Sequence, residues 1–252
     1  MPWNKRYEGA EPQRVNKWLA SEGVCSRREA EELIAKGLVR IDGERVDDPG
    51  RKILPGQSLE LGEAGGRPQI SVALNKPVGV VSAQPEGDQI PAARLLTRAN
   101  LIGPPRNLPN KRTRLAPLGR LDQDSRGLLL LSEDGVLAKA VIGPESKLDK
   151  EYLVRVAGQV TGKKLALLRH GLSLDGRQLR PAKIELVEPQ RLRFVLTEGR
   201  NRQIRRMCEL VDLDVTDLFR IRIGPLEVGD LPEGKWRALS MDERETLIAA
   251  SK

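Results

Sequence analysis

The sequence predicts an α+β fold in two unequal domains: a small N-terminal domain of helices plus a small sheet, and a larger domain on a mixed or antiparallel sheet. Three observations predict it. With 252 residues, 39% of them hydrophobic, the chain can bury one large core and one small one. Apolar residues have mainly helical spacing early in the chain and mainly alternate, as in strands, after residue 70. Between the two regions, residues 63–69 combine glycine, proline and polar residues, which is typical of a linker.

The N-terminal domain is expected at residues 14–62, behind a tail. Residues 1–13 are polar, contain proline and lack periodicity, so we expect them to be a flexible tail. The signals for the elements of the domain are local. They are apolar residues at helical spacing from Val15, a capping box at Ser26 and Glu29, a hairpin turn at Asp42-Gly43 and a closing strand at 58–61.

The charge of the chain indicates a polyanionic partner. There are 43 basic and 35 acidic residues, a formal net charge of +8, and such an excess fits nucleic acid, although an ordinary basic protein would share it. In the small domain the basic residues cluster enough to form an RNA-binding face, whereas any single one could be a solvated helix side chain. The residues expected to contact RNA phosphates there are Arg14, Lys17, Arg27 and Arg28.

The larger domain is expected at residues 70–252. Its predicted strands are 70–74, 128–132, 152–156, 183–187, 192–196 and 218–223. Its predicted helices are 136–142, 162–169, 202–211 and a C-terminal helix behind a capping box at Ser240 and Glu243, with turn signals at Asp134-Gly135 and Asp175-Gly176.

A long basic loop interrupts this pattern between residues 91 and 117. Loops of this length are uncommon unless they are functional or disordered. We expect this one to contact RNA through Arg106, Lys111, Arg112 and Arg114.

The segment most informative about chemistry is 118–127. Asp122 lies in it, directly before the apolar run 128–131. A loop carboxylate held by a core strand is well placed for catalysis, because the strand fixes its position while the loop stays accessible. Asp122 and Asp124 could equally be turn residues that cap their own loop.

Four segments in order make a more specific pattern. They are Leu74-Asn-Lys-Pro-Val-Gly79, Gly119-Arg-Leu-Asp122, Lys150-Glu-Tyr-Leu-Val154 and Glu198-Gly-Arg-Asn-Arg-Gln-Ile-Arg-Arg-Met207. With these segments the chain resembles the RsuA-type family of ribosomal RNA pseudouridine synthases (RsuA, RluB, RluE and RluF), and its first part resembles the S4 RNA-binding domain. The resemblance covers residues 14 to about 245, and it leaves the loop at 91–116 unexplained.

The resemblance implies a reaction and a set of site residues. Members of the family detach uracil from its ribose, rotate the base and rejoin it through C5. Asp122 is then the nucleophile, attacking the uracil ring or the ribose anomeric carbon, and Arg205 is the cation that keeps it ionised. Tyr152 would stack on the flipped base. The residues then expected to contact RNA or shape the site are Arg120, Lys76, Arg200, Arg202 and Arg206.

The implied substrate is ribosomal RNA. The segment 201–209 is most similar to RluF-type members, which act on large-subunit ribosomal RNA, and a tRNA anticodon stem-loop is a second candidate. We expect no cofactor and no metal, because isomerisation gains and loses no atoms. Without an apolar segment that could span a membrane, and with Cys25 and Cys208 far apart in sequence, we expect a cytoplasmic monomer.

Two other classes of protein stay open at this point. A non-catalytic RNA-binding or ribosome-assembly protein could use the same basic domain. A nucleoside or glycoside hydrolase would also cleave a glycosidic bond, but it normally needs a second positioned carboxylate, for which Asp124 is the candidate.

Overall fold

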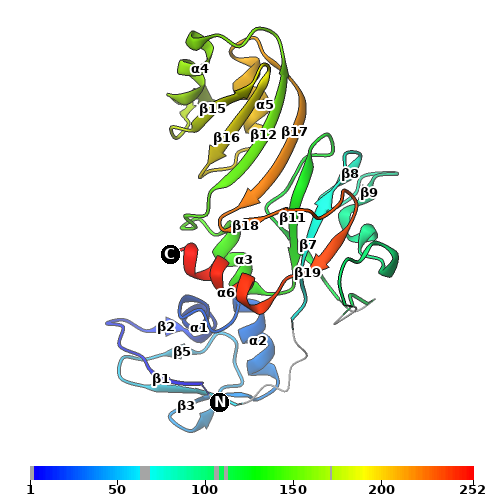
Figure 1. The fold of residues 1–252 in the computed structure, drawn as a ribbon. Helices are drawn as coiled ribbons and strands as arrows, with labels where there is room; N and C mark the ends of the chain where they lie inside the picture. Colours follow the sequence, from blue (N-terminus) through cyan, green and yellow to red (C-terminus); the bar gives the residue numbers. More distant parts are fainter. Residues whose placement is uncertain (1–2, 63–68, 105–107, 111–112, 171) are drawn as a thin grey trace. The chain divides into compact units, whose positions relative to one another are not determined.

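A computed structural model describes residues 3–62, 69–104, 108–110, 113–170 and 172–252. The chain forms two compact units. One contains the residues up to Gln69 together with Asp134–Lys139, and the other contains Ile70–Glu133 and Ala140–Lys252. Figure 1 shows the elements of each unit along the chain.

The N-terminal unit packs two helices against a small antiparallel sheet. The Asp42-Gly43 turn has φ values of 50° and 84°, as a tight hairpin turn requires. Ser26 and Glu29 form the reciprocal capping box that starts the second helix. The elements are α1 (Val15–Ser21) and α2 (Arg27–Ala35), a sheet in the order β1 (Trp3–Arg6), β6 (Ser58–Leu61), β3 (Val39–Ile41) and β4 (Glu44–Arg45), and the pair β2 (Gln13–Arg14) and β5 (Lys52–Ile53).

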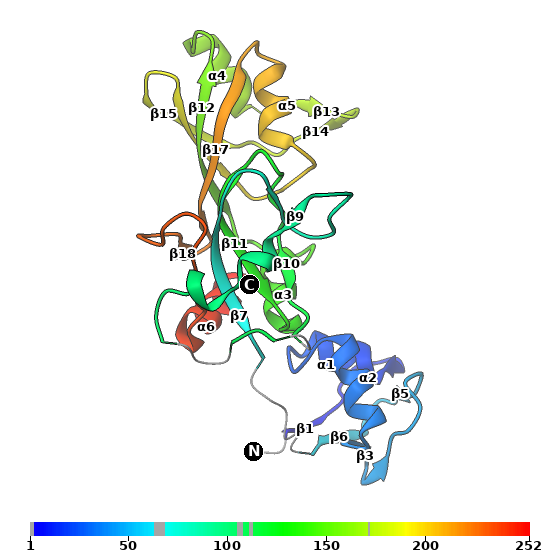
Figure 2. The same ribbon diagram turned by 90° about the vertical axis from the view of Figure 1, so that its right-hand side faces the viewer.

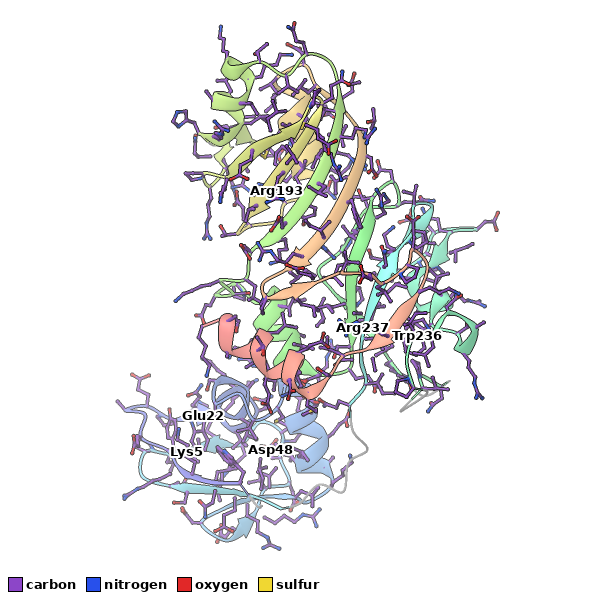
Figure 3. All side chains as sticks on the ribbon, viewed as in Figure 1. Lys5, Glu22, Asp48, Arg193, Trp236 and Arg237 are labelled. Carbon is purple, nitrogen blue, oxygen red and sulfur yellow. The ribbon has the colours of Figure 1, made fainter. Side chains whose placement is uncertain are left out.

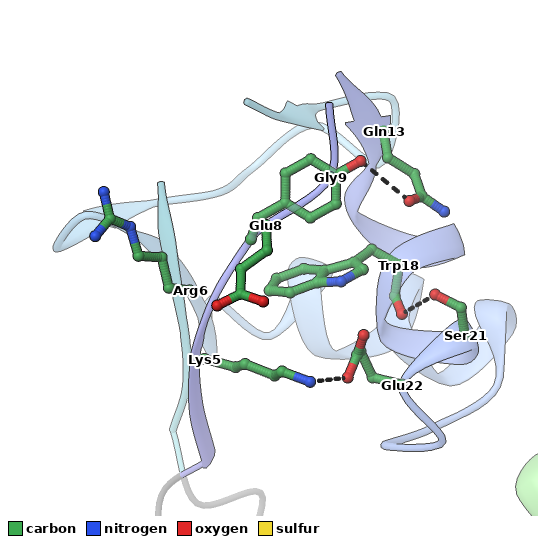
Figure 4. A pocket seen from close by; sticks show the side chains of 9 residues that line it. Lys5, Arg6, Glu8, Gly9, Gln13, Trp18, Ser21 and Glu22 are labelled. Atoms are coloured by element: carbon green, nitrogen blue, oxygen red, sulfur yellow. Dashed lines mark hydrogen bonds and ion pairs between the residues drawn. The ribbon is translucent and has the colours of Figure 1, made fainter. Parts of the chain in front are cut away.

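The prediction of a flexible tail at residues 1–13 was wrong for the part that the structure describes. Strand β1 pairs along its whole length with β6. Tyr7 is buried edge-on against Trp18, with ring centroids 5.2 Å apart. Figure 4 shows the Trp18 ring in a shallow pocket that the Lys5–Glu22 ion pair borders. The aromatic residues order this segment because they complete the small core, which outweighs its polar composition.

The larger unit is built on one mixed sheet, which confirms the predicted fold class. Its main path runs in the order β15 (Lys183–Glu188), β16 (Arg191–Leu196), β12 (Lys150–Ala157), β17 (Asp214–Ile223), β11 (Arg126–Ser132), β7 (Ser71–Lys76) and β19 (Trp236–Ala238). Strand β10 (Ala116–Leu118) also pairs with β11, and β18 (Leu226–Glu227) pairs with β17.

The contact between β11 and β17 is different from the other strand pairs described in this sheet. It is parallel, whereas they are antiparallel, and it contains only two residue pairs, Arg126 with Phe219 and Gly127 with Arg220. Arg126 reinforces it by a bidentate hydrogen bond to Asp217 at 2.8 Å and by stacking 4.2 Å from the centre of the Phe219 ring. Two antiparallel blocks are thus joined in one sheet. The first contains β15, β16, β12 and β17, and the second contains β10, β11, β7 and β19.

Each block has its own core. Helices α4 (Gly162–Arg169) and α5 (Gln203–Glu209) contact the first block (Figure 2). Phe194 and Met207 are fully buried in its core. In the second block, Trp236 of β19 is buried against β7 and β11 (Figure 3). The remaining elements are α3 (Gly135–Ile142), α6 (Met241–Ala250), the parallel pair β8 (Val80–Val81) and β9 (Ile90–Pro91), the hairpin β13 (Ser173–Leu174) and β14 (Arg177–Gln178), and the 3-10 helices Ala92–Leu95 and Arg98–Asn100.

Two segments have more definite structures than their sequence signals specified. At the turn signal Asp134-Gly135, Asp134 Oδ1 accepts hydrogen bonds from Val136 N and Leu137 N at the start of α3. Much of the segment 91–117 is ordered, because Trp236 Nε1 donates to Thr97 O at 2.8 Å and Leu101 bridges to Trp236. Of the basic residues predicted to contact RNA there, Arg114 is exposed, while Arg106, Lys111 and Arg112 lie outside the described residues.

Within the described part of the chain, no helix is both long enough and apolar enough to span a membrane.

Candidate active site

Asp122 lies on the loop between β10 and β11, beside the point where β11 meets β17. Main-chain contacts fix the loop on both sides of this residue. The buried Ser82 hydroxyl donates to Leu121 O at 2.6 Å and accepts from Leu121 N at 2.8 Å. Gly79 N donates to Gln123 O at 2.8 Å. The Asp122 side chain itself is 30% exposed, so a rigid loop presents an accessible carboxylate.

Arg220 holds the same loop from the opposite strand, and sequence reasoning missed it. It is 2% exposed, and its guanidinium donates to Leu128 O at 2.7 Å, Gly119 O at 3.1 Å and Arg120 O at 3.4 Å. A signal did exist in the sequence. Arg220 follows Leu218 by two positions, so strand periodicity places it on the buried face.

Arg202 is the cation next to Asp122, where the sequence predicted Arg205. Arg202 Nη1 lies 3.7 Å from Asp122 Oδ2, and Arg202 Nη2 lies 2.9 Å from Asp124 Oδ2. Arg205 instead pairs with Asp124, its Nε 3.3 Å from Asp124 Oδ2. It also donates to Asp124 O at 2.8 Å and to Val215 O at 3.0 Å. Arg205 is not the neighbour of Asp122, because these hydrogen bonds hold its guanidinium against the main-chain oxygens of Asp124 and Val215.

Asp124 is a structural carboxylate rather than a second acid. Burial alone would raise its pKa, but the hydrogen bond from Arg202 and the charge of Arg205 outweigh that effect and hold the pKa of Asp124 below its usual value. The general acid of a hydrolase needs the opposite shift. The arrangement therefore disfavours a glycoside hydrolase.

Tyr152 lies half-buried in β12 and packs against the cores of both blocks of the larger unit. In the sheet it is paired with Arg220 on one side and with Phe194 on the other. Arg220 donates hydrogen bonds to the main chain of the Asp122 loop, so Tyr152, its neighbour in the sheet, lies in the part of the sheet next to that loop.

Three of the residues expected to contact RNA or shape the site form hydrogen bonds within the protein. Lys76 is fully buried, and its Nζ donates to Pro77 O at 2.9 Å and Val80 O at 2.7 Å. Strand β7, which contains Lys76, lies between β11 and β19, so both of its edges are paired, and its residues from Val72 to Lys76 are buried on both faces. Arg200 donates to the main-chain oxygens of the β13–β14 hairpin, and Arg206 forms a bidentate pair with Asp175 in its turn. Arg200 and Arg206 thus support this hairpin.

The other predicted RNA contacts are exposed. Arg120 is exposed two residues before Asp122. Arg14, Lys17, Arg27 and Arg28 are exposed on the N-terminal unit.

The buried Lys76 predicts a measurable pH effect on stability. Burial and the nearby charge of Arg220 lower the pKa of Lys76 from 10.5 to about 8. Between these values the unfolded chain binds more protons than the folded one, so the contribution of Lys76 to stability should rise with pH. We expect the free energy of unfolding of the wild type, minus that of Lys76→Met, to increase by roughly 3 kcal/mol between about pH 8 and pH 10.5.

Urea denaturation of both proteins across this pH range would test the prediction. The exposed Lys183 of β15 provides the control, because Lys183→Met should give a difference that does not depend on pH. A flat difference for Lys76→Met as well would contradict the prediction.

Neither cysteine is suited to be a nucleophile. Cys25 and Cys208 are both buried, and burial raises the pKa of each thiol to about 12. Across the described ranges, no three side chains of His, Cys, Asp or Glu gather as metal ligands.

Comparison with known proteins gives the class of this fold and site. Residues 70–210 match the RNA pseudouridylate synthase family, and residues 13–59 match the S4 domain. The first match covers more than half of the sequence, so the chain belongs to the RNA pseudouridylate synthase family. It is an isomerase that converts uridine to pseudouridine in RNA, and not only an RNA-binding protein.

Particular relatives extend the similarity over nearly the whole chain. The dual-specificity RNA pseudouridine synthase RluF of Salmonella typhi is 35% identical over 242 residues, which cover 91% of this chain and 76% of the relative. The ribosomal large subunit pseudouridine synthase B of Bacillus subtilis is 33% identical, covering 94% of this chain and 96% of the relative. A crystal structure of a pseudouridylate synthase superposes with a TM-score of 0.65 at 26% identity, covering 94% of this chain and all of that one.

Proposed function

We propose that Asp122 is the nucleophile of the isomerisation and that the substrate is ribosomal RNA, with a large-subunit uridine as target. The observation that carries the proposal is the position of Asp122. It is a partly exposed carboxylate on a loop that Ser82 and Arg220 fix through the main chain. A nucleophile held rigidly in this way loses little entropy on reaching the reacting atom.

The proposed reaction needs only groups of the chain. The Asp122 carboxylate forms a bond to the uracil ring or to the ribose anomeric carbon, and the bond between N1 and that carbon breaks. After the base rotates, C5 bonds to the anomeric carbon and the bond to Asp122 breaks, which returns the free carboxylate. N1 gains a proton and C5 loses one, so the composition of the uridine is conserved. Tyr152 is proposed to stack on the extruded base, which must leave its helix to be reached.

Arg202, which lies beside Asp122, supplies the cation that favours the ionised carboxylate in this proposal. Arg205 acts through Asp124 by fixing the loop. The role that the sequence assigned to Arg205 is therefore divided between two arginines.

Ribosomal RNA as substrate is supported by the relatives and by the N-terminal unit. The two named relatives are a dual-specificity RNA enzyme and a large-subunit enzyme. The S4 domain carries the exposed Arg14, Lys17, Arg27 and Arg28, which suit phosphate contacts. We place the enzyme in the cytoplasm, where ribosomal RNA is available, and expect it to act as a monomer, with a tRNA anticodon stem-loop as a second candidate substrate.

Tritium release from C5-labelled uridine tests this function and its substrate. Transcripts of large-subunit RNA, small-subunit RNA and tRNA, each labelled at C5, are incubated with the wild-type protein. We expect release from the large-subunit transcript, at a level that corresponds to one or a few uridines. Release only from the small-subunit transcript would overturn the proposed substrate while leaving the proposed nucleophile in place.

A further inference from the structure

Arg202 lies beside the carboxylate of the proposed nucleophile, Asp122. Its guanidinium donates to both carboxylate oxygens of Asp124, at 3.3 and 2.9 Å, and its Nη1 lies 3.7 Å from Asp122 Oδ2. The residue precedes α5 with φ 50° and ψ 32°. This left-handed conformation is uncommon for arginine, so the surrounding structure must hold the backbone of Arg202 there.

The contact lies on the accessible side of the site. The side chain of Arg202 is 42% exposed and that of Asp122 is 30% exposed, whereas that of Arg205 is 10% exposed. The main chain on either side of Asp122 is held by Ser82, Gly79 and Arg220. Arg202 is therefore the more exposed partner of this contact, and a substrate strand at Asp122 would lie within reach of its guanidinium.

The strengths of the two ion pairs indicate which arginine gives way. An exposed pair such as Arg202 with Asp124 contributes little to stability. Breaking the contacts of a buried, multiply bonded group such as Arg205 costs far more. The binding of RNA can therefore displace Arg202 easily and Arg205 only with difficulty.

We infer that Arg202 exchanges its partners when RNA binds. In the free protein it bridges Asp122 and Asp124; in the complex it binds a backbone phosphate of the substrate strand, which uncovers Asp122. A guanidinium fork fits phosphate oxygens as well as it fits carboxylate oxygens, and a phosphate adjoins every nucleotide that could enter the site. The inference rests on the proposed function, because it assumes that the uridine is delivered to Asp122.

The exchange makes Asp124 a competitor of RNA for Arg202. Replacing it in Asp124→Asn should therefore tighten RNA binding, by roughly 3- to 10-fold if the released pair is worth about 1 kcal/mol. The tightening should disappear when Arg202→Asn is also present. Asparagine is chosen at position 202 because it tolerates the left-handed conformation and lacks the charge.

Asp175→Asn is the matched control. Asp175 also forms a bidentate pair with an arginine of α5, Arg206, and is exposed. The two substitutions change the net charge equally, so a general electrostatic effect would appear in both. We expect Asp175→Asn to change RNA affinity by less than about twofold, because it releases Arg206 beside the β13–β14 hairpin and not beside Asp122.

The experiment measures the dissociation constants of the full-length proteins for a fluorescein-labelled RNA stem-loop that contains uridine, over a series of salt concentrations. If Arg202 binds a phosphate, Arg202→Asn should reduce the slope of log affinity against log salt by about 0.7 to 0.9. Thermal unfolding shows whether each variant is folded. If Asp124→Asn unfolds, the salt slope of Arg202→Asn decides alone.

The outcomes separate this inference from the proposed function. Tightening that depends on Arg202, together with a reduced salt slope, supports the exchange. Equal tightening with and without Arg202, or a salt slope of the wild-type value in Arg202→Asn, overturns it. The binding measurement and the tritium measurement are independent. If the partner exchange is overturned, loss of tritium release in Asp122→Asn would still support Asp122 as the nucleophile.

Discussion

Tritium release from C5-labelled RNA should fall by more than about 10³-fold when Asp122 is replaced by asparagine, with RNA affinity unchanged or slightly tighter. The amide has nearly the same shape as the carboxylate but cannot form the covalent bond that starts the reaction. Stability should change by less than about 1 kcal/mol, because Asp122 is partly exposed and its ion pair with Arg202 spans 3.7 Å.

The measurement compares single-turnover release by the wild type, Asp122→Asn and Asp175→Asn on the same transcript. Asp175→Asn removes an equal charge from an exposed turn and should retain the wild-type rate. Release by Asp122→Asn within tenfold of the wild type would exclude Asp122 as the nucleophile.

Gly127→Ala should destabilise the catalytic unit by more than about 3 kcal/mol, the second large effect. Gly127 has φ 111°, where side chains are strained, and a Cβ atom there would meet Arg220 O and Arg220 N. Both are main-chain atoms of the partner strand, so no side chain can move to make room. The substitution would separate β11 from β17 and displace the guanidinium that holds the Asp122 loop.

Gly162→Ala is the control for this substitution. Gly162 opens α4 and has open space where its Cβ would lie, so alanine should be neutral or slightly stabilising. Calorimetry of the three proteins gives the comparison. An unfolding transition of Gly127→Ala at the wild-type temperature would show that β11 and β17 can part without loss.

Features with a local cause could be predicted from the sequence. The closing strand at 58–61, the capping boxes at Ser26 and Ser240 and the strands beside Tyr152 follow from periodicity and cap chemistry within a few residues. The position of Asp122 next to a core strand was also readable, because the apolar run 128–131 follows it directly.

Features that depend on distant partners could not be predicted. Strand β1 is ordered by β6, more than 50 residues away, so its own composition was misleading. Lys76 stands in a strand that is buried on both faces, which depends on segments packed against the sheet from elsewhere in the chain. Arg202 lies beside Asp122 because Arg205 is bound to the main chain of the loop. The charge of the two arginines does not show which of them takes which position.

The short parallel contact between β11 and β17 divides the active site between two bodies. Asp122 belongs to the block of β10, β11 and β7, whereas Tyr152, Arg202 and Arg205 belong to the block of β12, β16 and β17. Two residue pairs join the main chains of the blocks, and arginine side chains cross the same boundary. Arg126 binds Asp217, and Arg220 binds the main chain of the Asp122 loop. The position of the proposed nucleophile relative to the proposed stacking ring is therefore set by a few guanidinium groups, and a substitution at Arg126 or Arg220 would shift Asp122 relative to Tyr152.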